Sequence, residues 1–123
     1  MGIKHLMDGI LKRIIWLGSS RKDVKSFPDS VQQRIGYALY LAQTGNKGEN
    51  VKILKGFGSA NTLEVIAYDK QGTYRAVYTV QYKSTLYILH CFQKKSTHGI
   101  ATSKLDMDLI KERLKLAEQL EKE

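Results

Sequence analysis

The fold is decided by residues 63–92, which read LEVIAYDKQGTYRAVYTVQYKSTLYILHCF. Segments rich in β-branched and aromatic residues predict three strands within this stretch: 63–68, 73–82 and 86–92. The first two flank Asp69-Lys70-Gln71-Gly72, a turn with glycine where a positive φ is needed. The second and third are joined by three residues only. Because connections this short force neighbouring strands to run antiparallel, the middle of the chain is predicted to be a β-meander.

Amphipathic helices are predicted on either side of this meander. The first begins at Ser26-Phe27-Pro28-Asp29, because proline suits the first helical turn, where its missing N–H has no intrahelical partner. It ends at Gly45-Asn46, which tolerate a left-handed cap. The last helix begins at Ser103-x-x-Asp106, which resembles a capping box. Apolar residues at helical spacing form the two buried faces: Val31, Ile35, Ala38 and Ala42, then Leu109, Ile110, Leu114, Ala117 and Leu120.

Two further strands complete the predicted order. Residues 11–17 are rich in β-branched and aromatic types and stop at Gly18, and residues 51–55 alternate over a shorter run. The resulting order is β-α-(β)-β-β-β-α, an α+β domain that spans residues 1–123, with residues 1–10 as a loose leader.

Length and composition exclude several classes of protein. A chain of 123 residues with 42% hydrophobic residues forms one domain with one core. No apolar run approaches the ~20 residues that cross a bilayer, and Asp8 interrupts any signal-like segment. Cys91 is the single cysteine, so a disulfide framework is excluded and a reducing cytoplasm is the expected location.

Positive charge is concentrated in the middle of the chain. The net charge is +8, and residues 51–105 carry eight basic groups against Glu64 and Asp69. Residues 106–123 carry four basic and six acidic groups. This distribution is typical of a surface that binds a polyanion, although a basic solvated surface without a nucleic-acid partner remains the alternative.

Alternation along residues 73–82 gives that strand two different faces. Tyr74, Ala76 and Tyr78 share the face predicted to lie in the core. Arg75 and Thr79 share the other, largely polar face, which is predicted to meet solvent or a ligand. Arg75 therefore contacts a ligand, or it is a surface residue that pairs with Glu64 across the hairpin.

The segment after the last strand also favours phosphate contacts. Lys94 and Lys95 follow the strand, and His98 lies three residues further on. The alternative is a solvated loop. A zinc site at His90, Cys91 and His98 lacks both the usual spacing and a fourth ligand, so no metal is expected.

Four motifs in order resemble the phage-derived, HigB-like branch of the RelE toxin superfamily. That branch reads Leu-Lys-Gly-x-Gly, Leu-x-Glu-(Leu/Val), (Tyr/Phe)-Arg-x-x-Tyr and His-x-Phe-x-Lys-Lys at matching distances. The corresponding strings here are Leu54-Lys55-Gly56-Phe57-Gly58, Leu63-Glu64-Val65, Tyr74-Arg75-Ala76-Val77-Tyr78 and His90-Cys91-Phe92-Gln93-Lys94-Lys95.

The resemblance implies a fold, an activity and a site. The fold is that of a small microbial ribonuclease, a twisted antiparallel sheet of about four strands with helices on one face. The activity is that of a type II toxin, an endoribonuclease that cuts mRNA, often on the ribosome, without metal or cofactor. The catalytic residues implied are Arg75, Lys94, Lys95 and His98, and the RNA-binding residues are Lys55, Lys83, Tyr82 and His90.

The sequence departs from the family at its C-terminal end. Relatives place a tyrosine or a His/Asp/Tyr group there, whereas residues 105–122 contain no aromatic residue or histidine. His98, Tyr82 and Lys55 are therefore the candidates for acid and base. The alternatives to a nuclease are a protein that binds RNA without cutting it, and a structural partner of a DNA-binding protein.

A type II toxin implies a partner that silences it. The expected partner is a separate antitoxin, a small helix-turn-helix protein through which any contact with DNA is indirect. Its acidic or helical segment is predicted to cover the groove lined by Arg75, Lys94 and Lys95. Docking away from the groove is the alternative.

Overall fold

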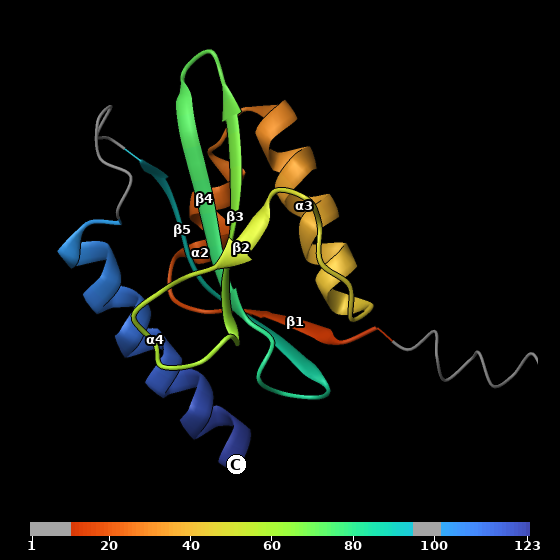
Figure 1. Ribbon diagram of the computed structural model, residues 1–123, viewed down its shortest axis with the longest axis vertical. Helices are drawn as coiled ribbons and strands as arrows, with labels where there is room; N and C mark the ends of the chain where they lie inside the picture. Colours follow the sequence, from red (N-terminus) through yellow and green to blue (C-terminus); the bar gives the residue numbers. More distant parts are fainter. Residues whose placement is uncertain (1–10, 95–101) are drawn as a thin grey trace, which may run out of the picture.

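The computed structural model describes residues 11–94 and 102–123, which form one α+β unit (Figure 1). The predicted leader, residues 1–10, lies outside the described residues. None of the described helices is long and apolar enough to cross a membrane. The elements in chain order are β1 (Arg13–Trp16), α2 (Ser20–Lys25), α3 (Asp29–Gln43), β2 (Val51–Ile53), β3 (Thr62–Asp69), β4 (Gly72–Thr79), β5 (Thr85–Lys94) and α4 (Lys104–Lys122).

The predicted meander is present as β3, β4 and β5, which run antiparallel. Asp69 pairs with Gly72, so the first hairpin closes through Lys70 and Gln71, and Gly72 has the predicted positive φ of 144°. The short β2 extends the sheet at one edge, where it pairs with β3.

The prediction of a purely antiparallel sheet of about four strands is wrong in its detail. The sheet has five strands in the order β1-β5-β4-β3-β2, and β1 runs parallel to β5. The short links of the meander dictate antiparallel neighbours, but β1 reaches β5 across most of the chain. Its direction is therefore free of that constraint. The α+β class itself is confirmed.

Helix α3 packs on one face of the sheet, as its periodicity predicts. Its buried residues include Val31, Ile35 and Ala38, which share a core cluster with Ala76 and Tyr78 of β4. The helix ends as predicted, because Gly45 has a φ of 86° and the N–H of Asn46 donates to the carbonyl of Leu41 at 2.8 Å. The short helix α2, which was not predicted, joins the same cluster through Val24.

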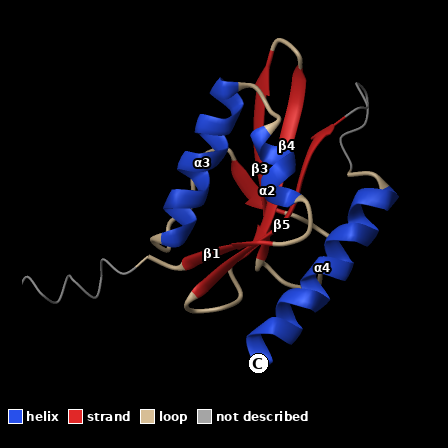
Figure 2. Cartoon of the chain, turned by 180° about the vertical axis from the view of Figure 1, so that it is seen from behind, coloured by secondary structure: helices blue, strands red, loops and turns tan. Residues whose placement is uncertain are grey.

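Helix α4 packs on the opposite face, so the prediction of helices on one face is wrong. Ile110 and Ala117 form a second core cluster with Val77 of β4 and Leu89 of β5. Figure 2, which views the chain from behind, shows α2 in front of the strands and α4 apart from α3. Because α4 covers this side, the face of β4 that was predicted to meet solvent is buried, and Thr79 is fully so.

One irregularity determines which side chains of β5 reach the α4 side. Val77 pairs with His90 and Tyr78 pairs with Ile88, so Leu89 is an extra residue in β5, a β-bulge. Ile88 and Cys91 lie in the α3 cluster, whereas Leu89 and Phe92 pack in the α4 cluster. Without the bulge, strict alternation from Ile88 would turn His90 toward α3.

The bulge is also where α4 is fastened to the sheet. Arg113 of α4 donates to the backbone carbonyl of Leu89 at 2.8 Å. The guanidinium lies directly over Gly18, at the position that a Cβ atom would fill, and Gly18 has a φ of 54°. Glycine at this position therefore permits both the turn and the close approach of α4.

Candidate nucleic-acid interface

Arg75 and Glu64 form a buried ion pair on the α4 side of the sheet. Arg75 Nη1 donates to Glu64 Oε1 at 2.7 Å, and the two side chains are 9% and 6% exposed. The pairing across the hairpin confirms one of the two predictions made for Arg75. It is buried and not at the surface, because α4 lies against this side of the sheet.

A cleft lined by basic side chains lies beside this ion pair. Its walls come from the strand β2, from the segment after it and from the start of α4, and it is lined by Lys52, Leu54, Lys55, Glu64, Arg75, Thr102 and Met107. Lys52 lies directly opposite Glu64 in the β2–β3 pairing, and Lys55 is exposed. Three cations and one carboxylate therefore face the same small space.

Lys94 belongs to the same electrostatic group. It ends β5 on the Arg75 side, and burial first, then the charge of Arg75, lower the pKa of its ammonium group. The carboxylates of Glu64 and Asp106 act in the opposite direction. The charge of Arg75 thus acts on Lys94, and a phosphate bound between the two cations would offset their repulsion.

His90 connects β5 to the first turn of α4. Its Nε2 lies 2.8 Å from Asp106 Oδ1, while the other Asp106 oxygen accepts a hydrogen bond from Ser103 at 2.7 Å. Ser103 is the N-cap of α4 and accepts from the N–H of Asp106, as the capping box predicts. The His90 ring stacks on Phe92 and is 7% exposed. These contacts give it a role in positioning α4, and its contact with RNA stays a prediction.

The structure brings only some of the predicted site residues together. Arg75 and Lys55 line the cleft, and Lys94 interacts with Arg75. Tyr82 and Lys83 follow the far end of β4, and the strand alone, from Arg75 to Thr79, separates them by roughly 13 Å. Lys95 and His98 lie outside the described residues.

The two described residues considered for a zinc site, His90 and Cys91, do not converge. His90 reaches Asp106 on α4, whereas Cys91 is buried in the α3 cluster on the other face. Across residues 11–94 and 102–123, no group of three or more histidine, cysteine or carboxylate side chains could hold a metal ion.

Two members of this site were missed in the sequence. Lys52 could have been found, because alternation in 51–55 puts it on a defined face beside the hairpin. Asp106 could not, since its partner His90 is 16 residues away on another element and only the fold joins them.

The five-stranded mixed sheet with α4 across its charged face defines a RelE-like fold. The structure is similar to that of a mutant of the E. coli toxin RelE in the free state, with a TM-score of 0.56, 13% sequence identity, and coverage of 85% of this chain and 96% of that chain. The model of the phage-derived Gp49-like family (DUF891) matches residues 22–115. The chain belongs to this family, and the predicted resemblance to the phage-derived branch is confirmed. No curated protein matches the sequence.

Proposed function

We propose that this protein is the toxin of a type II toxin–antitoxin pair, an endoribonuclease that cuts mRNA on the ribosome in the cytoplasm without a metal ion. The observation that carries the proposal is the cleft that Lys52, Lys55 and Arg75 line together with Glu64. The RelE-like fold supports it.

The chemistry follows from what RNA cleavage requires. The 2′-hydroxyl attacks the adjacent phosphorus, its O–P bond forms, and the bond to the 5′-oxygen breaks to leave a 2′,3′-cyclic phosphate. Glu64, the carboxylate that lines the cleft, accepts the hydroxyl proton. Arg75 and Lys55 stabilise the charge that builds on the equatorial oxygens, with Lys94 beside them. His98 is the predicted donor of a proton to the leaving oxygen.

Induced expression tests the proposal. We expect growth arrest and cleavage of transcripts at defined positions, which primer extension maps. Lys55→Ala is expected to lower the cleavage rate by about a hundredfold to a thousandfold, as for the loss of one charge-stabilising group. Lys70→Ala is the matched control, because Lys70 is an exposed lysine in the β3–β4 turn. Intact growth and intact RNA with the unaltered protein would contradict the proposal.

A second candidate is a protein that binds RNA without cutting it. The observation in its favour is that Arg75 is already engaged by Glu64, so a phosphate must compete for the guanidinium. Purified protein that shifts RNA in a gel, with steep salt dependence and no cleavage product, would favour this candidate. A mere structural partner of a DNA-binding protein would show no affinity for RNA.

The proposed partner is a separate antitoxin, a small helix-turn-helix protein, whose acidic or helical segment covers the cleft. Opposite charge on the two surfaces makes association fast and salt-sensitive. Lys94→Glu combined with Lys95→Glu is expected to slow association. An unchanged rate and salt dependence would show that the antitoxin docks away from the cleft.

A further inference from the structure

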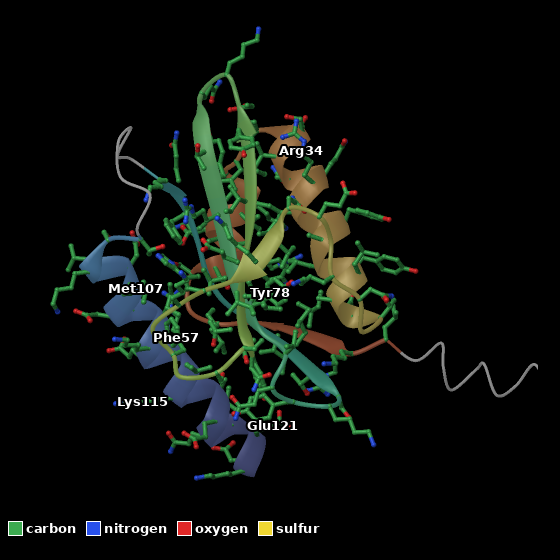
Figure 3. All side chains as sticks on the ribbon, in the orientation of Figure 1. Arg34, Phe57, Tyr78, Met107, Lys115 and Glu121 are labelled. Atoms are coloured by element: carbon green, nitrogen blue, oxygen red, sulfur yellow. The ribbon has the colours of Figure 1, made fainter. Side chains whose placement is uncertain are left out.

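A second recess lies along α4, separate from the cleft. It lies between the segment after β2, the end of β4 and the middle of α4, and is lined by Gly56, Phe57, Tyr82, Lys111, Lys115 and Glu118. The two hollows are lined by neighbouring parts of the chain: Lys55 of the cleft precedes Gly56 of the recess, and Met107 lies one helical turn before Lys111. Figure 3 shows Phe57 beside α4, between Met107 and Lys115.

The recess combines cationic and aromatic side chains. Lys111 and Lys115 are exposed and lie one turn apart on α4, so both ammonium groups reach the same side of the recess. Phe57 and Tyr82 are half-buried, so part of each ring remains open to solvent. Lysines beside open aromatic rings are the features that bind single-stranded nucleic acid, the first through phosphates and the second by stacking on bases.

The ring of Tyr82 is held in place before any ligand arrives. It packs edge-on against Tyr87 with the ring centres 5.6 Å apart. Tyr87 in turn donates its hydroxyl to Glu121 of α4 at 2.7 Å. A ring fixed in this way loses little freedom when a base stacks on it, which favours binding.

Glu118 supplies a hydrogen-bond acceptor in the same recess. Glu118 and Tyr82 line the recess together, and burial first, then the charges of Glu118 and Glu121, raise the pKa of Tyr82. A carboxylate accepts from the exocyclic amine of adenine, cytosine or guanine. Uracil has no exocyclic amine and presents two carbonyl oxygens, which a carboxylate repels.

We infer that this recess is a flanking-base pocket, a subsite for a nucleotide next to the one held in the cleft. The base stacks on Phe57 and Tyr82, its amine donates to Glu118, and Lys111 and Lys115 contact the adjoining phosphates. The inference rests on the proposed function, since it extends the same RNA site by one subsite and gives that subsite a preference for a base with an exocyclic amine over uracil.

Binding of short single-stranded RNA to the full chain tests the flanking-base pocket. The probes are fluorescent 2′-O-methyl hexanucleotides of adenine or uracil, which lack the attacking hydroxyl, and a nucleoside monophosphate, which fills one subsite only. We expect the Lys111→Ala, Lys115→Ala double variant to bind the adenine hexanucleotide about tenfold more weakly, with a salt slope smaller by about 1.4. Binding of the monophosphate in the cleft should stay unchanged.

Two further variants test the base contacts. Tyr82→Leu keeps the apolar bulk that packs against the core and removes the flat ring, so we expect about tenfold weaker binding of the hexanucleotide. Glu118→Ala should lower the preference for adenine over uracil by about fivefold. Lys70→Ala and Tyr37→Ala are the controls, because both side chains are exposed and lie outside the two hollows. Lys111 and Lys115 are exposed, so their double variant is expected to fold. It therefore tests the inference even if Tyr82→Leu does not fold.

The outcomes separate this inference from the proposed function. If Lys55→Ala weakens hexanucleotide binding and the pocket variants do not, the flanking-base pocket is overturned. The proposed role of the cleft would be unaffected by that result. No binding of any RNA would overturn both. Variants that lose affinity for an oligoglutamate peptide while they bind RNA normally would show that the recess receives an acidic protein segment, and would equally overturn the inference.

Discussion

Arg75 Nη1 lies 2.7 Å from Glu64 Oε1, and this ion pair lies both in the sheet and in the wall of the cleft. The two residues occupy neighbouring strands of the hairpin, with Ile66 opposite Arg75 in the register. A buried charge without its partner destabilises the folded state. A substitution of either residue therefore changes both the stability of the sheet and the chemistry of the site.

Removing one member of this pair is expected to destabilise the protein. Arg75→Met or Glu64→Leu alone should lower the free energy of unfolding by about 3–5 kcal/mol, since each leaves an uncompensated buried charge. The double variant should lie closer to the unaltered protein than either single variant. Urea unfolding followed by circular dichroism measures all three.

The exposed pair of Lys104 and Asp108 is the control for that experiment. Its members are 2.9 Å apart and 88% and 54% exposed. Lys104→Ala should therefore leave the unfolding midpoint unchanged. A double variant at Glu64 and Arg75 as unstable as the two single losses added together would contradict the account. For assays of activity, Arg75→Lys is the better variant because it keeps the buried charge.

The lowered pKa of Lys94 predicts how RNA binding depends on pH. Burial and Arg75 favour the neutral amine, so Lys94 loses its charge at a lower pH than an ordinary lysine with a pKa of 10.5. Affinity for a 2′-O-methyl oligonucleotide should therefore begin to fall, as pH rises, before free lysines titrate. In Lys94→Arg the charge persists and this fall should disappear. Identical pH profiles for the two proteins would refute the contribution of Lys94.

Cys91 is expected to be unreactive in the folded protein. Burial raises the pKa of its thiol to about 12, so almost no thiolate exists at pH 8. Labelling by a thiol reagent should be slow in the native state and should rise with the fraction unfolded as urea is added. Fast labelling of the native protein would show that the α3 cluster opens at Cys91.

The same pKa also gives a direction for stability at alkaline pH. The unfolded thiol ionises near pH ~8.5. Between that pH and the folded pKa, the unfolded state binds fewer protons than the native state. Stability should therefore fall as pH rises above about 8.5, and Cys91→Ala should weaken this dependence.

Tyr78 is expected to lose little when its hydroxyl is removed. The side chain is fully buried, burial raises its pKa to about 12, and its hydroxyl has no hydrogen-bond partner among the described residues. Because an unsatisfied buried hydroxyl is unfavourable, Tyr78→Phe should raise the free energy of unfolding by about 1 kcal/mol. Tyr37→Phe, at an exposed tyrosine, should change nothing. Thermal unfolding of both variants measures the difference. A loss of stability in Tyr78→Phe would contradict the prediction and would show that the hydroxyl has a hydrogen-bond partner.

The parts of the fold that follow from local spacing were predictable. The two-residue turn at Lys70 and Gln71 sets the hairpin register, and that register brings Glu64 next to Arg75. Helical spacing likewise predicts the buried face of α3. In both cases a single element or one short link contains all the information that is needed.

The rest depends on contacts between distant segments. Helix α4 covers Arg75 and Thr79, whose polar side chains resemble a solvent face when the strand is considered alone. The face that His90 occupies depends on the bulge at Leu89, and no residue pattern within β5 reveals an extra residue. The separation of Tyr82 from Arg75 follows from the length of β4. The family resemblance implies one site that contains both residues, so it does not predict this separation.

The bulge at Leu89 has a consequence for how this family varies in length. It absorbs one residue while Ile88 and Cys91 stay on one face and Phe92 stays on the other. A relative that lacks this residue keeps the other side chains of β5 facing the same way, so a one-residue gap there preserves the orientation of His90 and Lys94 although it removes the carbonyl that Arg113 contacts. An insertion after Cys91 would instead turn Lys94 toward the opposite face. Alignments of relatives should therefore allow a gap at Leu89 and none in the five residues that follow it.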